Sequence, residues 1–332
     1  MEIDPLRQTA CFVVKHAHDV GNCRRHAVTL ATRIGFDETV AGNVALIATE
    51  FATNLVKHAG GGHVYIRALP GAGACGLELM SIDRGPGFDM DVAVRDGFST
   101  SGSPGTGLGA VGRLATQFSV YALPGKGSVL VATVRPDRKA SSGANLGAVC
   151  MAVEGETLCG DGWAVVARGD TDIVMLCDGL GHGPLAAETT DAAIAFLRQA
   201  QAQPPEQLLQ GLHGALKGTR GAAVALAEVR PGRVVFAGIG NISAQLFSGV
   251  KAQGLASLNG IVGHQMVKVK AFDYDYRPGD TLIMHSDGLT GRWKIEDYPG
   301  LAFRPPELIA GVLFRDFRRA KDDATIIAYR RS

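Results

Sequence analysis

The stretch Arg135-Pro-Asp-Arg-Lys-Ala-Ser-Ser-Gly-Ala-Asn-Leu-Gly147 divides the chain into two halves. It combines charged and small residues without apolar periodicity, which is typical of a linker. The chain has 332 residues, of which 46% are hydrophobic and 20% charged. This composition suits soluble globular structure in about two domains. We therefore expect a first domain at 1–136, a linker at 137–146 and a second domain at 147–332.

The charge balance argues against a general attraction to polyanions. Lys and Arg number 33 and Asp and Glu 32, so no overall field favours nucleic acid or an anionic membrane. No run approaches 18 uninterrupted apolar residues, and the first residues lack a signal-peptide pattern. The six cysteines have no C-x-x-C spacing, which disfavours a zinc site or a disulfide framework. We expect a cytoplasmic protein with neither nucleic-acid nor membrane partners.

Before the linker, residues 40–55 predict a helix with one buried face. Its apolar residues recur at helical spacing: Val40, Val44, Ile47, Ala48, Phe51 and Leu55. Glu50, Asn54, Lys57 and His58 then share the opposite face. Glu50 could accept a proton from an attacking hydroxyl, and the Asn54 amide oxygen could bind Mg²⁺. The alternative is a solvated polar face, which the helix taken alone favours.

Two glycine-containing loops follow in this half. Asp83-Arg-Gly-Pro-Gly87 comes directly after the predicted strand 77–82, where the Asp83 carboxylate could accept a hydrogen bond from an adenine amino group. A loop of small residues at 99–109 then leads into a predicted helix, and its amides suit phosphates. Gly107-Leu-Gly-Ala-Val-Gly112 also fits the G-x-G-x-x-G pattern, but no strand directly precedes it, so we reject a dinucleotide fold.

The motifs E-x-x-x-N, D-x-G-x-G and G-T-G-L-G occur in this order and resemble those of the GHKL ATPase family over about residues 8–134. Within that family, Asp96-Gly-Phe-Ser-Thr-Ser-Gly102 and the short lid are similar to the RsbT-like anti-sigma-factor serine kinases. The resemblance implies a GHKL (Bergerat) α/β sandwich with Glu50 as catalytic base, Asn54 as Mg²⁺ ligand and Asp83 as adenine contact. It also implies ATP contacts from Lys57, Gly85, Gly87, Gly105, Thr106, Gly107, Leu108 and Gly109.

A histidine kinase is the nearest rival within the family. It needs a dimerising helical segment with a phosphoacceptor histidine ahead of this domain, and only a few residues precede it. His16, His18 and His26 are better explained as ordinary surface or core histidines. We expect the phosphate acceptor to be a hydroxyl on another protein.

After the linker, aspartates stand at the ends of predicted strands. They occur in Gly160-Asp-Gly162, Cys177-Asp-Gly-Leu-Gly-His-Gly183, His285-Ser-Asp-Gly-Leu289 and Lys321-Asp-Asp-Ala-Thr325. A sheet sandwich flanked by helices could bring together Asp161, Asp178, Asp287 and either Asp322 or Asp323. With the Gly179 carbonyl, these oxygens would suit two Mg²⁺ or Mn²⁺ ions, which polarise phosphoryl groups and activate a bridging water. A single Asp-Gly pair is more often only a turn.

Taken in order, the four motifs resemble the SpoIIE/RsbX-like branch of the PPM metal-dependent serine/threonine phosphatases across about residues 146–330. The resemblance implies an α-β-β-α sandwich in which Asp161 and Asp178 are catalytic. Asp322 matches the acid that opens the family's final motif, and Asp323 remains open. In the larger PPM phosphatases a histidine directly follows Asp-Gly, whereas here His182 comes two residues later. A general-acid role for His182 therefore stays open.

Together the two resemblances predict an α+β, bifunctional partner-switching regulator. It would phosphorylate a serine or threonine of a STAS-domain (anti-anti-sigma type) protein with ATP and Mg²⁺, and hydrolyse such a phosphoserine with two metal ions. One alternative is a phosphatase whose GHKL half only senses nucleotide. Another is an anti-sigma-type binding module that holds a sigma factor or a downstream activator and turns over little. The resemblance also allows a homodimer.

Overall fold

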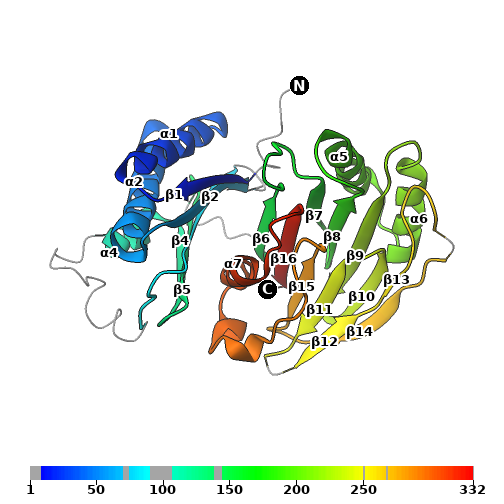
Figure 1. The fold of residues 1–332 in the computed structure, drawn as a ribbon. Coiled ribbons are helices and arrows are strands. Elements are labelled where there is room, and N and C mark those ends of the chain that lie inside the picture. Colours follow the sequence, from blue (N-terminus) through cyan, green and yellow to red (C-terminus); the bar gives the residue numbers. More distant parts are fainter. Residues whose placement is uncertain are drawn as a thin grey trace. The chain divides into compact units, whose positions relative to one another are not determined.

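The computed structural model describes residues 9–69, 75–89, 107–137, 144–249, 251–266 and 268–331. The chain forms two compact units, Met1–Ser142 and Gly143–Ser332 (Figure 1). Each unit has its own sheets and its own hydrophobic core, so the two are described separately.

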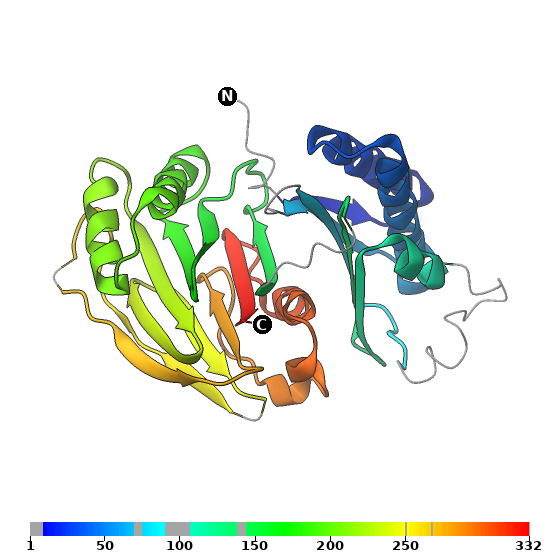
Figure 2. The same ribbon diagram turned by 180° about the vertical axis from the view of Figure 1, so that it is seen from behind.

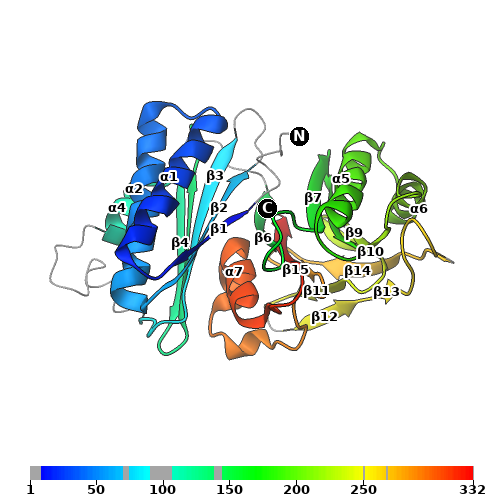
Figure 3. The same ribbon diagram turned by 45° about the horizontal axis from the view of Figure 1, so that its top comes forward.

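The first unit is an antiparallel sheet with helices on one face (Figure 3). The strand order is β1-β2-β3-β5-β4. The strands are β1 (Ala10–Val14), β2 (Gly62–Leu69), β3 (Gly76–Ile82), β4 (Gln117–Leu123) and β5 (Gly127–Val134). The helices are α1 (Ala17–Arg33), α2 (Glu38–Asn54) and α4 (Gly107–Leu114). Their apolar faces and the facing strand residues form one core.

Helix α2 begins where the sequence supplies a cap, since the Asp37 side chain accepts a hydrogen bond from the Val40 amide at 2.8 Å. The segment Glu38–Ala59 is long and apolar enough to cross a membrane by length and composition, but its apolar face lies in the core. The prediction of regular α-helical spacing through His58 is wrong. The last turn, η1 (Leu55–Ala59), is a π-helix, and its wider turn changes the direction of Lys57 and His58 relative to Glu50.

The second unit is a sandwich of two sheets (Figure 2). The first has the order β13-β10-β9-β8-β7, with β14 pairing β10, and the second the order β12-β11-β15-β16-β6. The strands of the first sheet are β7 (Asp161–Arg168), β8 (Thr171–Gly179), β9 (Ala222–Arg230), β10 (Gly232–Ile239), β13 (Ser257–Leu258) and β14 (Phe272–Tyr276). Those of the second are β6 (Ala144–Met151), β11 (Ser243–Phe247), β12 (Ala252–Leu255), β15 (Thr281–His285) and β16 (Ala324–Arg331).

Helices cover the outer faces of both sheets. Helices α5 (Pro184–Gln199) and α6 (Pro205–Ala215) pack on the first sheet, and α7 (Pro306–Phe317) packs on β6 and β16 of the second. Each begins with proline in its first turn, where the missing amide hydrogen costs nothing. Two short 3₁₀ turns, η2 (Ile295–Asp297) and η3 (Leu301–Phe303), precede α7. The expected α-β-β-α sandwich is confirmed, and its inner core lies between the sheets.

Candidate functional site

In the first unit, Glu50 lies beside the start of α4. A Cβ atom at Gly107 would lie 3.0 Å from Glu50 Oε2, so the absence of a side chain keeps the space next to this carboxylate open. Glu50 and Asn54 are half-buried on α2, whereas Lys57 and His58 are exposed. Gly105, Thr106 and the motif at 96–102 lie outside the described residues.

Asp83 is held at the end of β3 by two hydrogen bonds. Its Oδ1 accepts from the Gly85 amide at 2.7 Å, and its Oδ2 accepts from the hydroxyl of Ser128 on β5. These two contacts, one on each oxygen, fix the orientation of the Asp83 carboxylate. The chain also turns tightly here, because Gly87 has φ +61° and a Cβ atom there would lie 2.0 Å from the Leu123 carbonyl oxygen.

At the beginning of α4, one residue packs against the core and its two glycine neighbours leave open space. The Leu108 side chain is half-buried and packs against the core. Gly107 and Gly109 add no side chain beside it. An oriented carboxylate, a glycine turn and the cleared space beside Glu50 fit a bound nucleotide, with phosphates near the amides that open α4.

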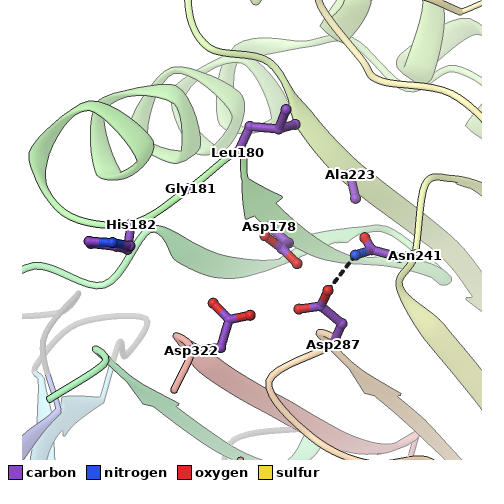
Figure 4. Close-up of a pocket in the computed structure, with 8 residues that line it drawn as sticks. All are labelled: Asp178, Leu180, Gly181, His182, Ala223, Asn241, Asp287 and Asp322. Atoms are coloured by element: carbon purple, nitrogen blue, oxygen red, sulfur yellow. Dashed lines mark hydrogen bonds between the residues drawn. The ribbon is translucent and has the colours of Figure 1, made fainter. Parts of the chain in front are cut away.

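In the second unit, strand ends bring the predicted aspartates to one edge of the sandwich. Asp161 opens β7 and lies opposite Asp178 in the β7–β8 register. Asp287 follows β15, and Asp322 precedes β16. A cavity of about 210 Å³ opens at this edge (Figure 4). Its lining residues are Asp178, Leu180, Gly181, His182, Ala223, Asn241, Asp287 and Asp322.

Asp322 and Asp323 have different surroundings. Asp322 lines the cavity. The Asp323 carboxylate instead accepts hydrogen bonds from the Val153 amide at 2.7 Å and the Gly160 amide at 2.6 Å, which ties the β6–β7 connection to the last strand. Asp161 is also set back from the cavity lining. It is buried, and its Oδ2 accepts a hydrogen bond from Ser286 Oγ at 2.6 Å.

The aspartates repel one another. Burial, followed by the charges of Asp161, Asp287, Asp322 and Asp323, raises the pKa of Asp178 to about 9. Burial is also the main reason that the pKa of Asp161 rises to about 7. The pKa of Asp287 is raised by burial and by Asp322. Such a cluster favours either protons or cations.

The donor set fits hard divalent cations that keep part of their water shell. In the described part of the chain, no group of three or more His, Cys, Asp or Glu side chains is arranged to hold an ion directly. Mg²⁺, however, is commonly held by one or two carboxylates and several waters. Asp178, Asp287 and Asp322 face a common space from three segments (Figure 4). Gly179 is not among the residues that line the cavity, and a Cβ atom there would lie 2.5 Å from the Ala186 carbonyl oxygen.

His182 lies apart from the three carboxylates, and its ring does not point toward them (Figure 4). Its Nδ1 pairs with Glu156 Oε1 at 2.8 Å. Gly183, at φ +74°, makes room for this carboxylate, because a Cβ atom there would lie 2.9 Å from Glu156 Oε2. The general-acid role of His182 stays a prediction that would require the ring to turn.

Several residues that orient the predicted aspartates were not identified from the sequence. Asn241 Nδ2 donates to Asp287 Oδ2 at 2.6 Å (Figure 4). Ser128 and Ser286 act in the same way on Asp83 and Asp161. Asn241 comes just after Gly240, at the end of β10. The predicted aspartates also stand at strand ends, so this position could have marked Asn241 as a candidate site residue. Ser128, within a strand, carried none.

Both halves match known families. Residues 13–134 match the model described as histidine kinase-like ATPase domain, and residues 168–332 match the model of stage II sporulation protein E (SpoIIE). The serine/threonine-protein kinase RsbT of Bacillus subtilis (strain 168) is 30% identical over 128 residues, which cover 38% of this chain and 96% of RsbT. The phosphoserine phosphatase RsbX of the same organism is 27% identical over 140 residues, covering 41% of this chain and 70% of RsbX.

Solved structures resemble a little over half of this chain. A chain described under "The bacterial stressosome: a modular system that has been adapted to control secondary messenger signaling" has a TM-score of 0.52 and 28% identity, and the match covers 56% of this chain and 99% of that one. RsbX in complex with magnesium has a TM-score of 0.50 and 22% identity, and covers 57% of this chain and 96% of RsbX. At 22% identity, the similarity to the RsbX structure is evidence for the fold alone.

Proposed function

The chain belongs to the family of the RsbT kinase through residues 13–134 and carries a SpoIIE-type PPM domain after it, and on this premise we propose that it is a bifunctional partner-switching regulator. Its first half transfers phosphate from ATP to a serine or threonine of a STAS-domain protein, and its second half removes phosphate from such a residue. It acts in the cytoplasm, and the phosphorylation state of the partner controls a sigma factor or a downstream activator.

In the kinase half, Glu50 takes the proton from the attacking hydroxyl as its oxygen bonds to the γ-phosphorus of ATP, while the bond from the γ-phosphorus to the β–γ bridging oxygen breaks and ADP leaves. Asn54 would supply an oxygen to the Mg²⁺ that accompanies ATP, and Asp83 would accept a hydrogen bond from the adenine amino group. Support for this comes from the cleared space beside Glu50 and from the two hydrogen bonds that orient Asp83.

In the phosphatase half, Asp178, Asp287 and Asp322 would hold two Mg²⁺ or Mn²⁺ ions, partly through water. When bound, these ions polarise the phosphoryl oxygens and supply a nucleophilic water near neutral pH. Asn241 fixes the orientation of Asp287 through its 2.6 Å hydrogen bond. Asp161 completes the acid cluster from behind the cavity and is oriented by Ser286.

The observation that carries the proposal is the acid cluster. Carboxylates from segments as far apart in the sequence as Asp178 and Asp287 line one cavity, and burial together with the charges of neighbouring aspartates raises the pKa of Asp178 to about 9. A structural role alone would not need buried like charges, because they destabilise the fold unless a cation joins them. The same chain carries the complete order of kinase motifs.

The test is a phosphotransfer assay with the full-length protein, Mg²⁺, radiolabelled ATP and purified STAS-domain proteins. We expect label on a serine or threonine of one of them, and labelling about a hundredfold slower with Glu50→Gln. If ATP binds but no STAS protein is labelled, the first half is a nucleotide sensor or a binding module. A phosphoserine substrate then tests the second half separately, with Mn²⁺ present and ATP absent.

A further inference from the structure

Arg220 reaches the wall of the acidic cavity from a different part of the chain. It lies in the connection between α6 and β9. A Cβ atom at Gly181 would lie 2.9 Å from Arg220 Nη1, so the guanidinium lies directly against the backbone of Gly181. Gly181 lines the cavity between Leu180 and His182. The arginine side chain is therefore next to the site although its backbone belongs to another segment.

The backbone on both sides of Arg220 is fixed. The Leu180 amide donates to the Gly221 carbonyl at 3.0 Å, which joins this connection to the cavity loop. The Gly221 amide donates to Thr219 Oγ1 at 3.0 Å, and His264 Nε2 pairs with the Thr219 carbonyl at 3.0 Å. These contacts hold the position from which the arginine side chain extends.

Arg220 is exposed, and within the described residues its guanidinium makes no hydrogen bond or ion pair. The lack of pairing matters because three carboxylates line the neighbouring cavity. An arginine whose role was to neutralise them would be expected to contact one. Its five donors remain available to an anion that enters the cavity.

We propose that Arg220 binds the phosphoryl group of the phosphoserine substrate at the mouth of this cavity, an inference that rests on the proposed phosphatase function. With cations held between the carboxylates, a phosphomonoester dianion would present its remaining oxygens to the other lining segments, which include Gly181. A planar guanidinium can donate two parallel hydrogen bonds to those oxygens, which a lysine ammonium cannot match in geometry. Gly181 permits this placement because a side chain there would push the guanidinium away.

The closing experiment compares Arg220→Ala and Arg220→Lys with Arg198→Ala in the full-length protein. Arg198 is a matched control, because it is exposed, lies in the last turn of α5 and makes no hydrogen bond or ion pair within the described residues. The first measurement is the hydrolysis of a phosphoserine peptide with Mn²⁺. Arg220→Ala should raise KM about tenfold with little change in kcat, Arg220→Lys should fall between, and Arg198→Ala should match wild type.

The second measurement does not need turnover. Inorganic phosphate is titrated calorimetrically into the Mg²⁺-saturated protein without ATP, and Arg220→Ala should bind it about tenfold more weakly than wild type or Arg198→Ala. Equal phosphate affinity in Arg220→Ala and wild type would overturn the inference, as would a fall in kcat with KM unchanged. If the wild type hydrolyses no phosphoserine, the proposed phosphatase function fails, and the phosphate titration still decides the role of Arg220.

Discussion

The two candidate sites treat their carboxylates in opposite ways. Asp83, in the ATPase half, has hydrogen-bond donors on both oxygens, from Gly85 and Ser128. Asp178, in the phosphatase half, faces other aspartates, and its pKa is raised to about 9 by burial and by their charges. The Asp83 carboxylate is thus oriented by the protein's own donors. The second site is incomplete until cations or protons reduce the repulsion.

Because of this difference, we expect divalent ions to affect the stability of one half and only the chemistry of the other. In the ATPase half, Mg²⁺ is expected to arrive with the nucleotide. In the phosphatase half, ions should stabilise the fold itself, because they bind the folded cluster and not the unfolded chain. Substitutions in one half should therefore leave the other half's chemistry intact.

The largest effect is expected from Asp178→Asn. Loss of a central cation-binding carboxylate should lower Mn²⁺-dependent hydrolysis of phosphoserine by about a thousandfold, because the ions contribute several kcal/mol to the transition state. ATP-dependent labelling of a STAS protein should be unchanged. Asp170→Asn, in the exposed β7–β8 turn, is the matched control. Steady-state phosphate release measures both, and unchanged turnover in Asp178→Asn would contradict the metal assignment.

Glu50→Gln makes the reciprocal test in the other half. Removal of the general base should lower phosphotransfer about a hundredfold, with ATP affinity and phosphoserine hydrolysis unchanged. Glu38→Gln, in the first turn of the same helix, controls for the loss of a charge. Single-turnover labelling with saturating ATP separates the chemical step from binding. Equal labelling rates in wild type and Glu50→Gln would remove Glu50 from the mechanism.

The sequence predicted the main helices and the cluster of aspartates, and there are physical reasons why it did not predict the rest. Apolar periodicity indicated α2, and ordered Asp-Gly motifs indicated the cluster around Asp178, because these signals are local. Strands β12, β13 and β14 were not predicted, since they are short and, in β14, built from alternating aromatic and aspartate residues.

The π-helical turn η1 and the orienting residues could not be predicted in the same way. A hydrogen bond such as Ser128 to Asp83 joins residues 45 positions apart, and its existence depends on the register of β3 and β5. The different roles of Asp322 and Asp323 likewise follow from which side chain meets the Val153 and Gly160 amides. The family motif favoured Asp322 as the cation ligand, but the composition and spacing of two adjacent aspartates could not show that Asp323 binds these amides.

Divalent ions should change stability in the phosphatase half. At a concentration of 100 times its Kd, an ion that binds only the folded state adds about 2.7 kcal/mol to the free energy of unfolding. Without ions, the raised pKa values of Asp161 and Asp178 mean that the folded state holds more protons than the unfolded state above pH 3.8. The stability that comes from protonation of these two aspartates is fully present below pH 3.8 and is lost as the pH rises through about 7 and about 9.

Scanning calorimetry of the full chain, with and without Mg²⁺, measures this effect. Only the transition of the second unit should shift with Mg²⁺ when ATP is absent, and the shift should grow with pH up to about 9. Asp178→Asn should raise metal-free stability at pH 8 and weaken the response to Mg²⁺. A transition that is indifferent to Mg²⁺ at every pH would mean that the cluster does not bind ions.

The smallest effect is expected from Ser128→Ala. Loss of one hydrogen bond that orients Asp83 should weaken ATP binding by about 1 kcal/mol, or roughly fivefold. Ser128→Thr keeps the hydroxyl and should bind ATP nearly as the wild type does. Equilibrium titration with a fluorescent ATP analogue measures the Kd. Equal weakening in both variants would show that packing at this position, and not the hydrogen bond, matters.

The most direct test of the central claim follows one phosphate on and off the same partner. The full-length protein labels a STAS-domain protein with Mg²⁺ and radiolabelled ATP, ATP is then removed, and Mn²⁺ is added. We predict that the label first appears on a serine or threonine of the partner and is then released as inorganic phosphate, with release absent in Asp178→Asn. Label that never reaches the partner, or that remains there after Mn²⁺ is added to the wild type, would contradict the account.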